Sequence, residues 1–181
     1  MESGKVESGK KIEYLLNQRF TGLDVDEVTD LMIKSHDSSF NDVMKNKETD
    51  SSYVPTIIAS IPQLRMTRRI KGEYELNETE MHKYFENSIG MVSDWRKRGP
   101  VYEVPFRTLY NKNFVNLYAA GRITSASDEM WDIMRVIPCC AVTGEAAGLS
   151  ASMSNDATKI DIKELQTELR KRNVVIHEKD L

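Results

Sequence analysis

The stretch that most constrains this chain is residues 113–151. Its apolar positions 114, 115, 117 and 118 predict a short strand, and two alanines followed by Gly121 end that strand with almost no side-chain volume. Glycine tolerates a positive φ and lets another group approach the backbone closely. The segment therefore predicts a strand whose end leaves room for a neighbouring group.

A long helix is predicted to begin at Ile137 and Pro138, because the missing N–H of proline would have no intrahelical partner in a first turn. Its free N–H groups and positive dipole end would face whatever lies beyond Gly121, so the two elements predict one wall of an anion or cofactor site. Small residues also recur along the helix and predict a bare face for close packing on a sheet or a flat ligand: Gly144, Ala147, Gly148 and Ala151.

Two separated motifs carry a family resemblance. One is NLYAAGRITSASDEMWDIMRVIPCCAVTGEAAG, with AGR after the strand, then S-x-x-x-E, R-V-x-P and a helix opening T-G-x-A-A-G. The other is RMTRRIKGEYEL, which fits R-x-T/S-R-R-I-x-G-x-Y-x-L. The chain resembles, over roughly residues 55–172, the C-terminal flavin-binding segment of FAD-dependent oxidoreductases of the fumarate-reductase-like and glucose-inhibited-division-like kind.

The resemblance implies FAD as cofactor and hydride transfer between a small organic substrate and the flavin. Such enzymes hold the ADP half of FAD on a G-x-G-x-x-G turn between a strand and a helix, and no such motif occurs in this sequence. The chain is therefore expected to be the C-terminal part of a longer enzyme, inactive without an N-terminal dinucleotide-binding half. A non-catalytic truncated or split-gene module that does not bind FAD alone, or that self-associates, is the alternative.

The expected cofactor-binding residues follow from the resemblance, and each has a structural alternative. Gly121 would otherwise be a turn glycine, Arg122 would pair with a nearby carboxylate instead of a phosphate, and Arg135 would be a solvated helix-end charge. The full set is Gly121, Arg122, Ser125, Arg135, Pro138, Cys139, Cys140, Thr143 and Gly144.

Two further groups of residues bear on a substrate site, and the two cysteines raise the separate question of a reactive thiol. Arg65, Arg68 and Arg69 would suit an anionic substrate, although such a charge run is usually solvated. Cys139 and Cys140 stand at a helix start, where a thiol pKa is lowered, but adjacent cysteines suit small buried side chains better than a dithiol. Candidates to line a cleft are Asp94, Trp95, Tyr102, Glu103 and Arg107.

The net charge and the few cysteines and histidines limit which kinds of partner and metal site are expected. The net charge of −3 offers no general attraction to nucleic acid or to an anionic membrane. The two adjacent cysteines and three scattered histidines give no metal-ligand spacing, and two cysteines do not make a secreted disulfide framework. With no signal-peptide core at the N-terminus, a cytoplasmic location is expected.

The periodicities predict an α+β fold in three parts: a helical N-terminal segment (1–52), part of a substrate or cap domain with a small antiparallel or mixed sheet (53–112), and the C-terminal part of an FAD-binding domain (113–181). Helices are expected at 12–20, after Asp24 or Asp26, from Asn77 to about residue 85, and from Asp161. A loop is expected at 45–52 and a last extended piece at 174–176. Expected strands are 54–64, 66–76, 88–95 and 101–110.

Overall fold

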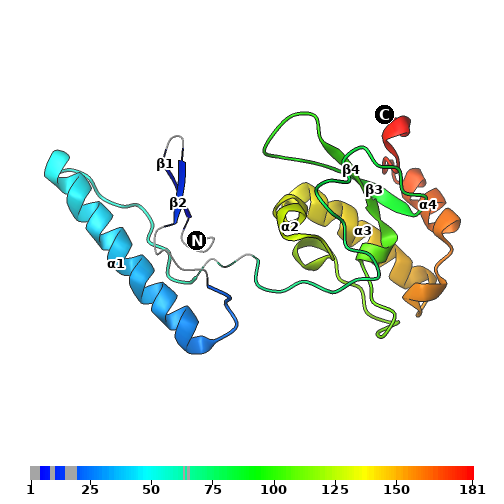
Figure 1. Cartoon of the computed structure of the whole chain (residues 1–181), viewed down its shortest axis with the longest axis horizontal. Helices are drawn as coiled ribbons and strands as arrows, with labels where there is room; N and C mark the ends of the chain where they lie inside the picture. Colours follow the sequence, from blue (N-terminus) through cyan, green and yellow to red (C-terminus); the bar gives the residue numbers. More distant parts are fainter. Residues whose placement is uncertain (1–4, 9–10, 15–19, 63, 65) are drawn as a thin grey trace. The chain divides into compact units, whose positions relative to one another are not determined.

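The computed structural model describes the chain apart from residues 1–4, 9–10, 15–19, 63 and 65. It confirms the α+β class and divides into two compact units, Met1–Thr67 and Arg68–Leu181 (Figure 1). The three-part division at residues 52 and 112 describes a larger enzyme and stays a prediction.

The first unit contains a hairpin and one long helix. Strands β1 (Lys5–Ser8) and β2 (Lys11–Tyr14) pair antiparallel, so the helix expected over 12–20 is wrong at its start, and residues 15–19 lie outside the described part. Helix α1 (Val25–Thr49) begins as predicted, because the Asp24 side chain accepts a hydrogen bond from the Glu27 N–H.

Helix α1 continues through residues 45–49, where a loop was expected. That segment lacks apolar periodicity, but its lysine and glutamate residues have good helix propensity, and propensity suffices to extend a helix already formed. The strand expected at 54–64 is also wrong, because the described residues of this segment are irregular and Ile57 and Ile58 are exposed.

The second unit is built on the hairpin of β3 (Ser88–Ser93) and β4 (Val101–Pro105), which pair antiparallel around the basic turn at residues 96–100. Both strands were predicted. The short helix η1 (Phe106–Thr108) follows β4 directly, so the second strand is shorter than expected. The hairpin contributes Ile89, Val92 and Val104 to the core.

Helices α3 (Ile137–Met153) and α4 (Ile162–Lys171) pack on β3, and both begin as predicted. Asp161 caps α4 by accepting hydrogen bonds from two N–H groups of its first turn. Helix α2 (Asp128–Met134) precedes α3. The remaining short helices are η2 (Gly121–Ile123), η3 (Ala157–Lys159) and η4 (Glu178–Asp180).

Within the described residues, no single helix has the length and apolar character to span a membrane. Helices α2 and α3 reach that length and composition only as a pair, and they meet at 88°.

The strand expected at residues 114–118 does not form. This segment is a series of turns, and Phe114 and Leu117 are 60 % and 50 % exposed. Tyr118 alone makes a β-bridge, to Tyr110. A strand is stable only beside a partner strand, and the described part of the chain offers this apolar run one bridging residue.

Residues 66–76 were expected to form a half-buried strand and instead run as irregular chain. Their backbone groups bond to η2 and the residues after it: the Ile70 N–H to the Ile123 carbonyl (2.9 Å) and the Leu76 N–H to the Ser125 carbonyl (3.3 Å). The apolar alternation is real, but its hydrogen-bond partners do not belong to a strand.

The helix expected after Asn77 is also wrong, although its capping interactions form. The Asn77 N–H donates to Glu80 Oε2 (3.1 Å), and the Thr79 N–H donates to Asn77 Oδ1 (3.0 Å). His82 then takes a positive φ of 59°, which ends the turn before a helix can propagate. A local capping signal therefore does not by itself specify a helix.

A buried carboxylate anchors the C-terminal segment. Glu103 accepts hydrogen bonds from the Phe85 N–H (2.7 Å), the Glu178 N–H (3.2 Å) and His177 Nδ1 (2.9 Å). Glu103 and His177 are 4 % and 3 % exposed. Residues 174–176 run without a β-ladder, and the Ile176 carbonyl accepts a bond from the Ser88 hydroxyl (2.7 Å). The C-terminus is therefore fixed to the hairpin through polar groups in the core.

Replacing this carboxylate by an amide is expected to destabilise the second unit. Glu103→Gln keeps the side-chain size but replaces one acceptor oxygen by an NH₂ group, so one buried donor loses its acceptor. The free energy of unfolding should therefore fall by about 1–3 kcal/mol. Urea unfolding measures this change. Glu86→Gln, at an exposed carboxylate nearby in sequence, is the control and should change stability by less than about 0.5 kcal/mol. Equal effects of the two substitutions would contradict the anchoring role.

Candidate functional site

Gly121 lies directly against the first turns of α3. Its N–H donates to Thr143 Oγ1 (2.8 Å), and a Cβ on Gly121 would lie 3.1 Å from Cys140 Sγ. Gly121 also has a φ of +66°, a conformation in which only glycine is unstrained. The two elements that the sequence predicts to be neighbours are therefore in contact, and the contact requires glycine.

The contact between Gly121 and α3 is closed. Cys140 fills the space that a side chain on Gly121 would occupy, so no ring fits between them. The Thr143 hydroxyl bonds back to the Cys139 carbonyl (2.8 Å), which keeps its oxygen directed at Gly121. These residues provide at most one edge of a flavin site. They do not by themselves form a seat for FAD.

The start of α3 is accessible. Val136 has extended backbone angles, Ile137 is 85 % exposed and Pro138 is exposed in the first turn. The Cys140 N–H donates to the Val136 carbonyl (3.0 Å), so this N–H, expected to be available to a ligand, closes the first turn of the helix. What the helix presents to solvent is its positive dipole end beside the segment that carries Gly121.

The two cysteines are free, and Cys139 is a buried side chain, as interpreted from the sequence. Cys139 Sγ donates to the Ile133 carbonyl (3.3 Å), and burial raises the pKa of this thiol to about 12. Its position at a helix start therefore does not make it a reactive thiolate, because desolvation outweighs the helix dipole. The Cys140 thiol is half-buried and contacts the Arg135 carbonyl (3.6 Å).

The small-residue face of α3 is mostly turned outward. A Cβ added to Gly144 or Gly148 would have no neighbouring atom within 4 Å, and both residues are exposed. The packing role expected for these two glycines is therefore not met within the described chain, whereas Ala147 is buried as expected. The buried face of α3 consists of Cys139, Thr143, Ala146, Ala147 and Ser150.

Two expected arginines, Arg135 from the cofactor set and Arg69 from the substrate set, pair with acidic side chains. Arg135 pairs with Asp132 (2.7 Å) at the end of α2, which favours its interpretation as a helix-end charge. Arg69 pairs with Asp128 (2.7 Å) and lies over the Trp131 ring, 4.6 Å from its centroid. The expected strand that would align the arginine cluster does not form.

Of the other expected site residues, Arg68 is exposed, and Arg65 lies outside the described residues. The Arg122 carbonyl accepts a hydrogen bond from Trp131 Nε1 (2.6 Å), and Ser125 is buried, with its N–H donating to the Thr108 carbonyl (3.0 Å). These contacts fix the backbone of the segment that follows Gly121.

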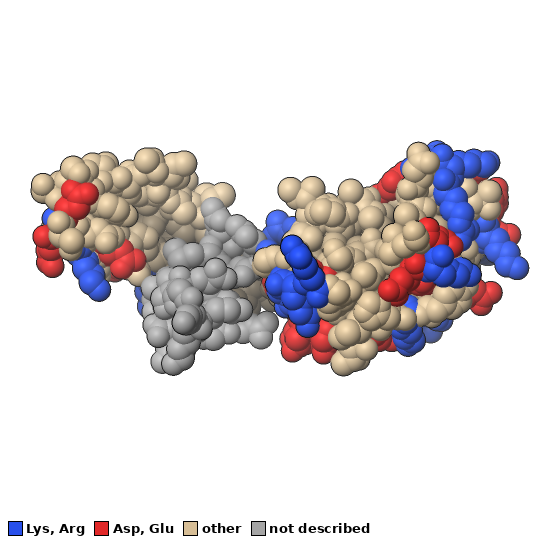
Figure 2. All heavy atoms as spheres, turned by 90° about the horizontal axis from the view of Figure 1, so that it is seen from above, with Lys and Arg blue, Asp and Glu red and all other residues tan. Residues whose placement is uncertain are grey.

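Asp94 and Trp95 take structural positions at the hairpin turn. Arg96 hydrogen-bonds both oxygens of Asp94 and holds the pKa of this carboxyl below its usual value. Trp95 Nε1 donates to the Asp132 carbonyl (3.1 Å). The turn is thereby fixed to α2. On the face seen in Figure 2, acidic and basic side chains are interspersed over the second unit.

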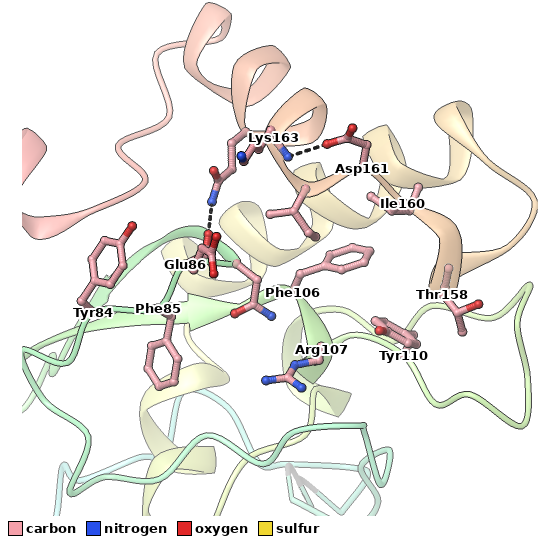
Figure 3. A pocket seen from close by; sticks show the side chains of 14 residues that line it. Tyr84, Phe85, Glu86, Phe106, Arg107, Tyr110, Thr158, Ile160, Asp161 and Lys163 are labelled. Atoms are coloured by element: carbon pink, nitrogen blue, oxygen red, sulfur yellow. Dashed lines mark hydrogen bonds between the residues drawn. The ribbon is translucent and has the colours of Figure 1, made fainter.

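A cleft of about 910 Å³ lies between residues 84–87, which precede β3, the η1 segment and the start of α4 (Figure 3). Arg107 lines it, whereas Tyr102 and Glu103 are buried in the core. This cleft was not predicted from the sequence, because its walls come from three segments that are far apart along the chain. Further lining residues include Tyr84, Asn87, Phe106, Tyr110, Thr158, Lys163 and Gln166.

In the part of the chain that the structure describes, no three His, Cys, Asp or Glu side chains gather in a way that could hold a metal ion.

Substituting Gly121 tests the close approach to α3. Gly121→Ala introduces a strained positive φ and a tight contact with Cys140, so the free energy of unfolding should fall by about 1–2 kcal/mol. The matched control is Gly144→Ala, where a helical glycine faces open space and alanine should add about 0.5–1 kcal/mol. Urea unfolding should thus give shifts of opposite sign. A neutral Gly121→Ala would contradict the required contact.

Thiol alkylation tests the burial of Cys139. In a Cys140→Ser variant, raising the thiol pKa from 9.0 to about 12 lowers the thiolate fraction at pH 8 about a thousandfold. The remaining thiol should therefore react about that much more slowly in the native protein than in urea, with a native rate that rises steadily with pH up to the pKa. Mass spectrometry follows the reaction. Equal native and unfolded rates would show that Cys139 is accessible.

Comparison with known proteins gives one family. A family described as FAD dependent oxidoreductase matches residues 10–169 of this chain, which includes Gly121, α2, α3 and most of α4. No curated protein and no solved structure matches it. The chain therefore belongs to the FAD-dependent oxidoreductases, a family of flavoproteins, and this membership implies FAD as its cofactor.

Proposed function

We propose that this chain is the C-terminal part of an enzyme that transfers hydride between a small organic substrate and FAD, of the fumarate-reductase-like and glucose-inhibited-division-like kind. Support comes from the family match over residues 10–169 and from the AGR and T-G-x-A-A-G motifs within it. When bound, FAD supplies the redox chemistry, and the protein supplies binding, orientation and electrostatics.

The contact between Gly121 and α3 is the observation that carries this proposal. It brings the AGR segment to the accessible start of α3, where Ile137 and Pro138 face solvent. A helix start stabilises nearby negative charge by about 0.3–2 kcal/mol. The role of α3 is thus to orient an electron-rich edge of the cofactor and to favour its negatively charged form.

We further propose that a second, dinucleotide-binding half of the G-x-G-x-x-G type completes the FAD site. The sequence has no such motif, and the closed contact at Gly121 would form only one edge of a site. That half, or self-association of this chain, would supply the other walls. A cytoplasmic location belongs to the same proposal.

The alternative is a non-catalytic module that folds without holding FAD. It is favoured by the same closed contact, because Cys140 occupies the space beside Gly121 and the glycine is explained by packing alone.

FAD binding distinguishes these functions. The chain is purified alone and after co-expression with a G-x-G-x-x-G half, and bound FAD is measured by its visible absorbance and by titration. The enzyme proposal predicts bound FAD in the co-expressed complex. If neither preparation binds FAD, the flavin function is wrong and the non-catalytic module stands.

A charge at Ile137 tests the role of the start of α3. Ile137→Glu places a negative charge at an exposed position beside the proposed flavin edge, and Ile137→Gln is the matched uncharged control. The glutamate should weaken FAD binding relative to glutamine by up to about 30-fold, the equivalent of about 2 kcal/mol. Equal affinities of the two variants in the co-expressed complex would contradict a flavin edge at this helix.

A further inference from the structure

The cleft between η1 and α4 is a separate candidate binding site within the second unit. Its walls come from residues 84–87, 106–110 and 157–166, and none of its lining residues belongs to α3 or to the Gly121 segment. Its volume of about 910 Å³ lies within the range of small-molecule sites, which are about 300–1,000 Å³. Neither the family match nor the proposed FAD site assigns a ligand to it.

Aromatic side chains line the cleft at both ends. Phe106 and Tyr110 lie against each other, with ring centroids 5.3 Å apart, and Tyr84 stands at the other end with its ring stacked on His177 (4.6 Å). Tyr84 is 55 % exposed, so a ring of a ligand has an aromatic surface to lie on. This composition favours a planar, unsaturated ligand.

Polar groups in the cleft are left for a ligand. Within the described residues, the side-chain amide of Asn87 has no hydrogen-bond partner, and Arg107 has no ion pair, its guanidinium lying 5.7 Å from the centroid of the Tyr74 ring. In the view of Figure 3 the Arg107 guanidinium lies below Phe106, between Phe85 and Tyr110. Arginine presents a planar set of donors that matches a carboxylate.

The wall opposite Arg107 is rigid. Gln166 is 7 % exposed, and its Nε2 donates to the carbonyls of Glu86 and Ser88 (2.9 Å each), which ties α4 to the start of β3. The Asp161 carboxylate accepts hydrogen bonds from the first-turn N–H groups of α4, which hold it at the start of that helix. The lining carries two positive side chains, Arg107 and Lys163, and two negative ones, Glu86 and Asp161.

From this arrangement we propose that the cleft binds a small aromatic carboxylate. The ring packs against the aromatic lining of the cleft, and the carboxylate accepts hydrogen bonds from Arg107 and Asn87. The proposal concerns binding and stands independently of FAD.

The test uses the full chain without FAD and titrates it with benzoate, measured by calorimetry and by ligand-observed NMR. Benzamide keeps the ring without the charge, acetate keeps the charge without the ring, and inorganic phosphate is an anion of another shape. Benzoate is expected to bind at least about tenfold more tightly than each of the three, since a charge-assisted hydrogen bond is worth about 1.5–3 kcal/mol.

Variants locate the site. Arg107→Gln should weaken benzoate binding about tenfold or more. Thr158→Trp, at an exposed position on the rim, should abolish binding by filling the cleft. The control Arg98→Gln removes an exposed arginine from the hairpin turn and should leave benzoate affinity unchanged. Circular dichroism confirms that each variant is folded.

Three results would overturn the proposal. If benzamide binds as tightly as benzoate, the cleft recognises the ring and not the carboxylate. If phosphate or acetate binds as tightly, the cleft is an unspecific anion site. Unchanged benzoate affinity in Arg107→Gln and Thr158→Trp would place any binding elsewhere. FAD binding by the co-expressed complex is unaffected by any of these outcomes, so the two proposals fail separately.

Discussion

The second unit depends on the absence of a side chain at Gly121. The residue combines a positive φ with a position that a Cβ could take only by pressing on Cys140. Its N–H bond to Thr143 then joins the AGR segment to α3 at a polar group on the buried face of that helix. This close contact fixes the position of the start of α3 relative to the Gly121 segment. The same contact therefore serves stability and positions the candidate flavin edge.

The segment around Gly121 is also tied to the floor of the aromatic cleft. The Ala119 N–H donates to the Leu109 carbonyl (2.7 Å), and the Ser125 N–H donates to the Thr108 carbonyl (3.0 Å). Both acceptors lie at η1, which also supplies Phe106 and Arg107 to the cleft. The short helix η1 thus supports two candidate sites. Its backbone carbonyls hold the Gly121 segment, and its side chains line the cleft.

Features set by neighbouring residues were predictable from the sequence. Asp24 and Asp161 cap helices, and Pro138 opens one, because each acts on N–H groups within a few positions of itself. The strands of the β3–β4 hairpin were likewise predictable, because a short basic turn makes them partners. The family motifs identified the flavoprotein family, which no local rule would have done.

Features set by distant partners were not predictable. The apolar residues 114–118 have the pattern of a strand, but strand formation depends on a partner, and the described chain supplies one bridge. Asn77 forms its capping bonds, yet His82 turns the chain away. The Glu103–His177 pair joins residues 74 positions apart, and the cleft draws on three segments. Nothing in the local sequence indicates which distant residues come into contact.

Hydrogen–deuterium exchange with and without FAD, on the chain assembled with a dinucleotide-binding half, tests the central claim most directly. If the Gly121 segment and the start of α3 form one edge of the flavin site, FAD should slow exchange at residues 119–125 and 137–141 together. FAD-dependent protection confined to the added half, with both segments of this chain unchanged, would contradict it.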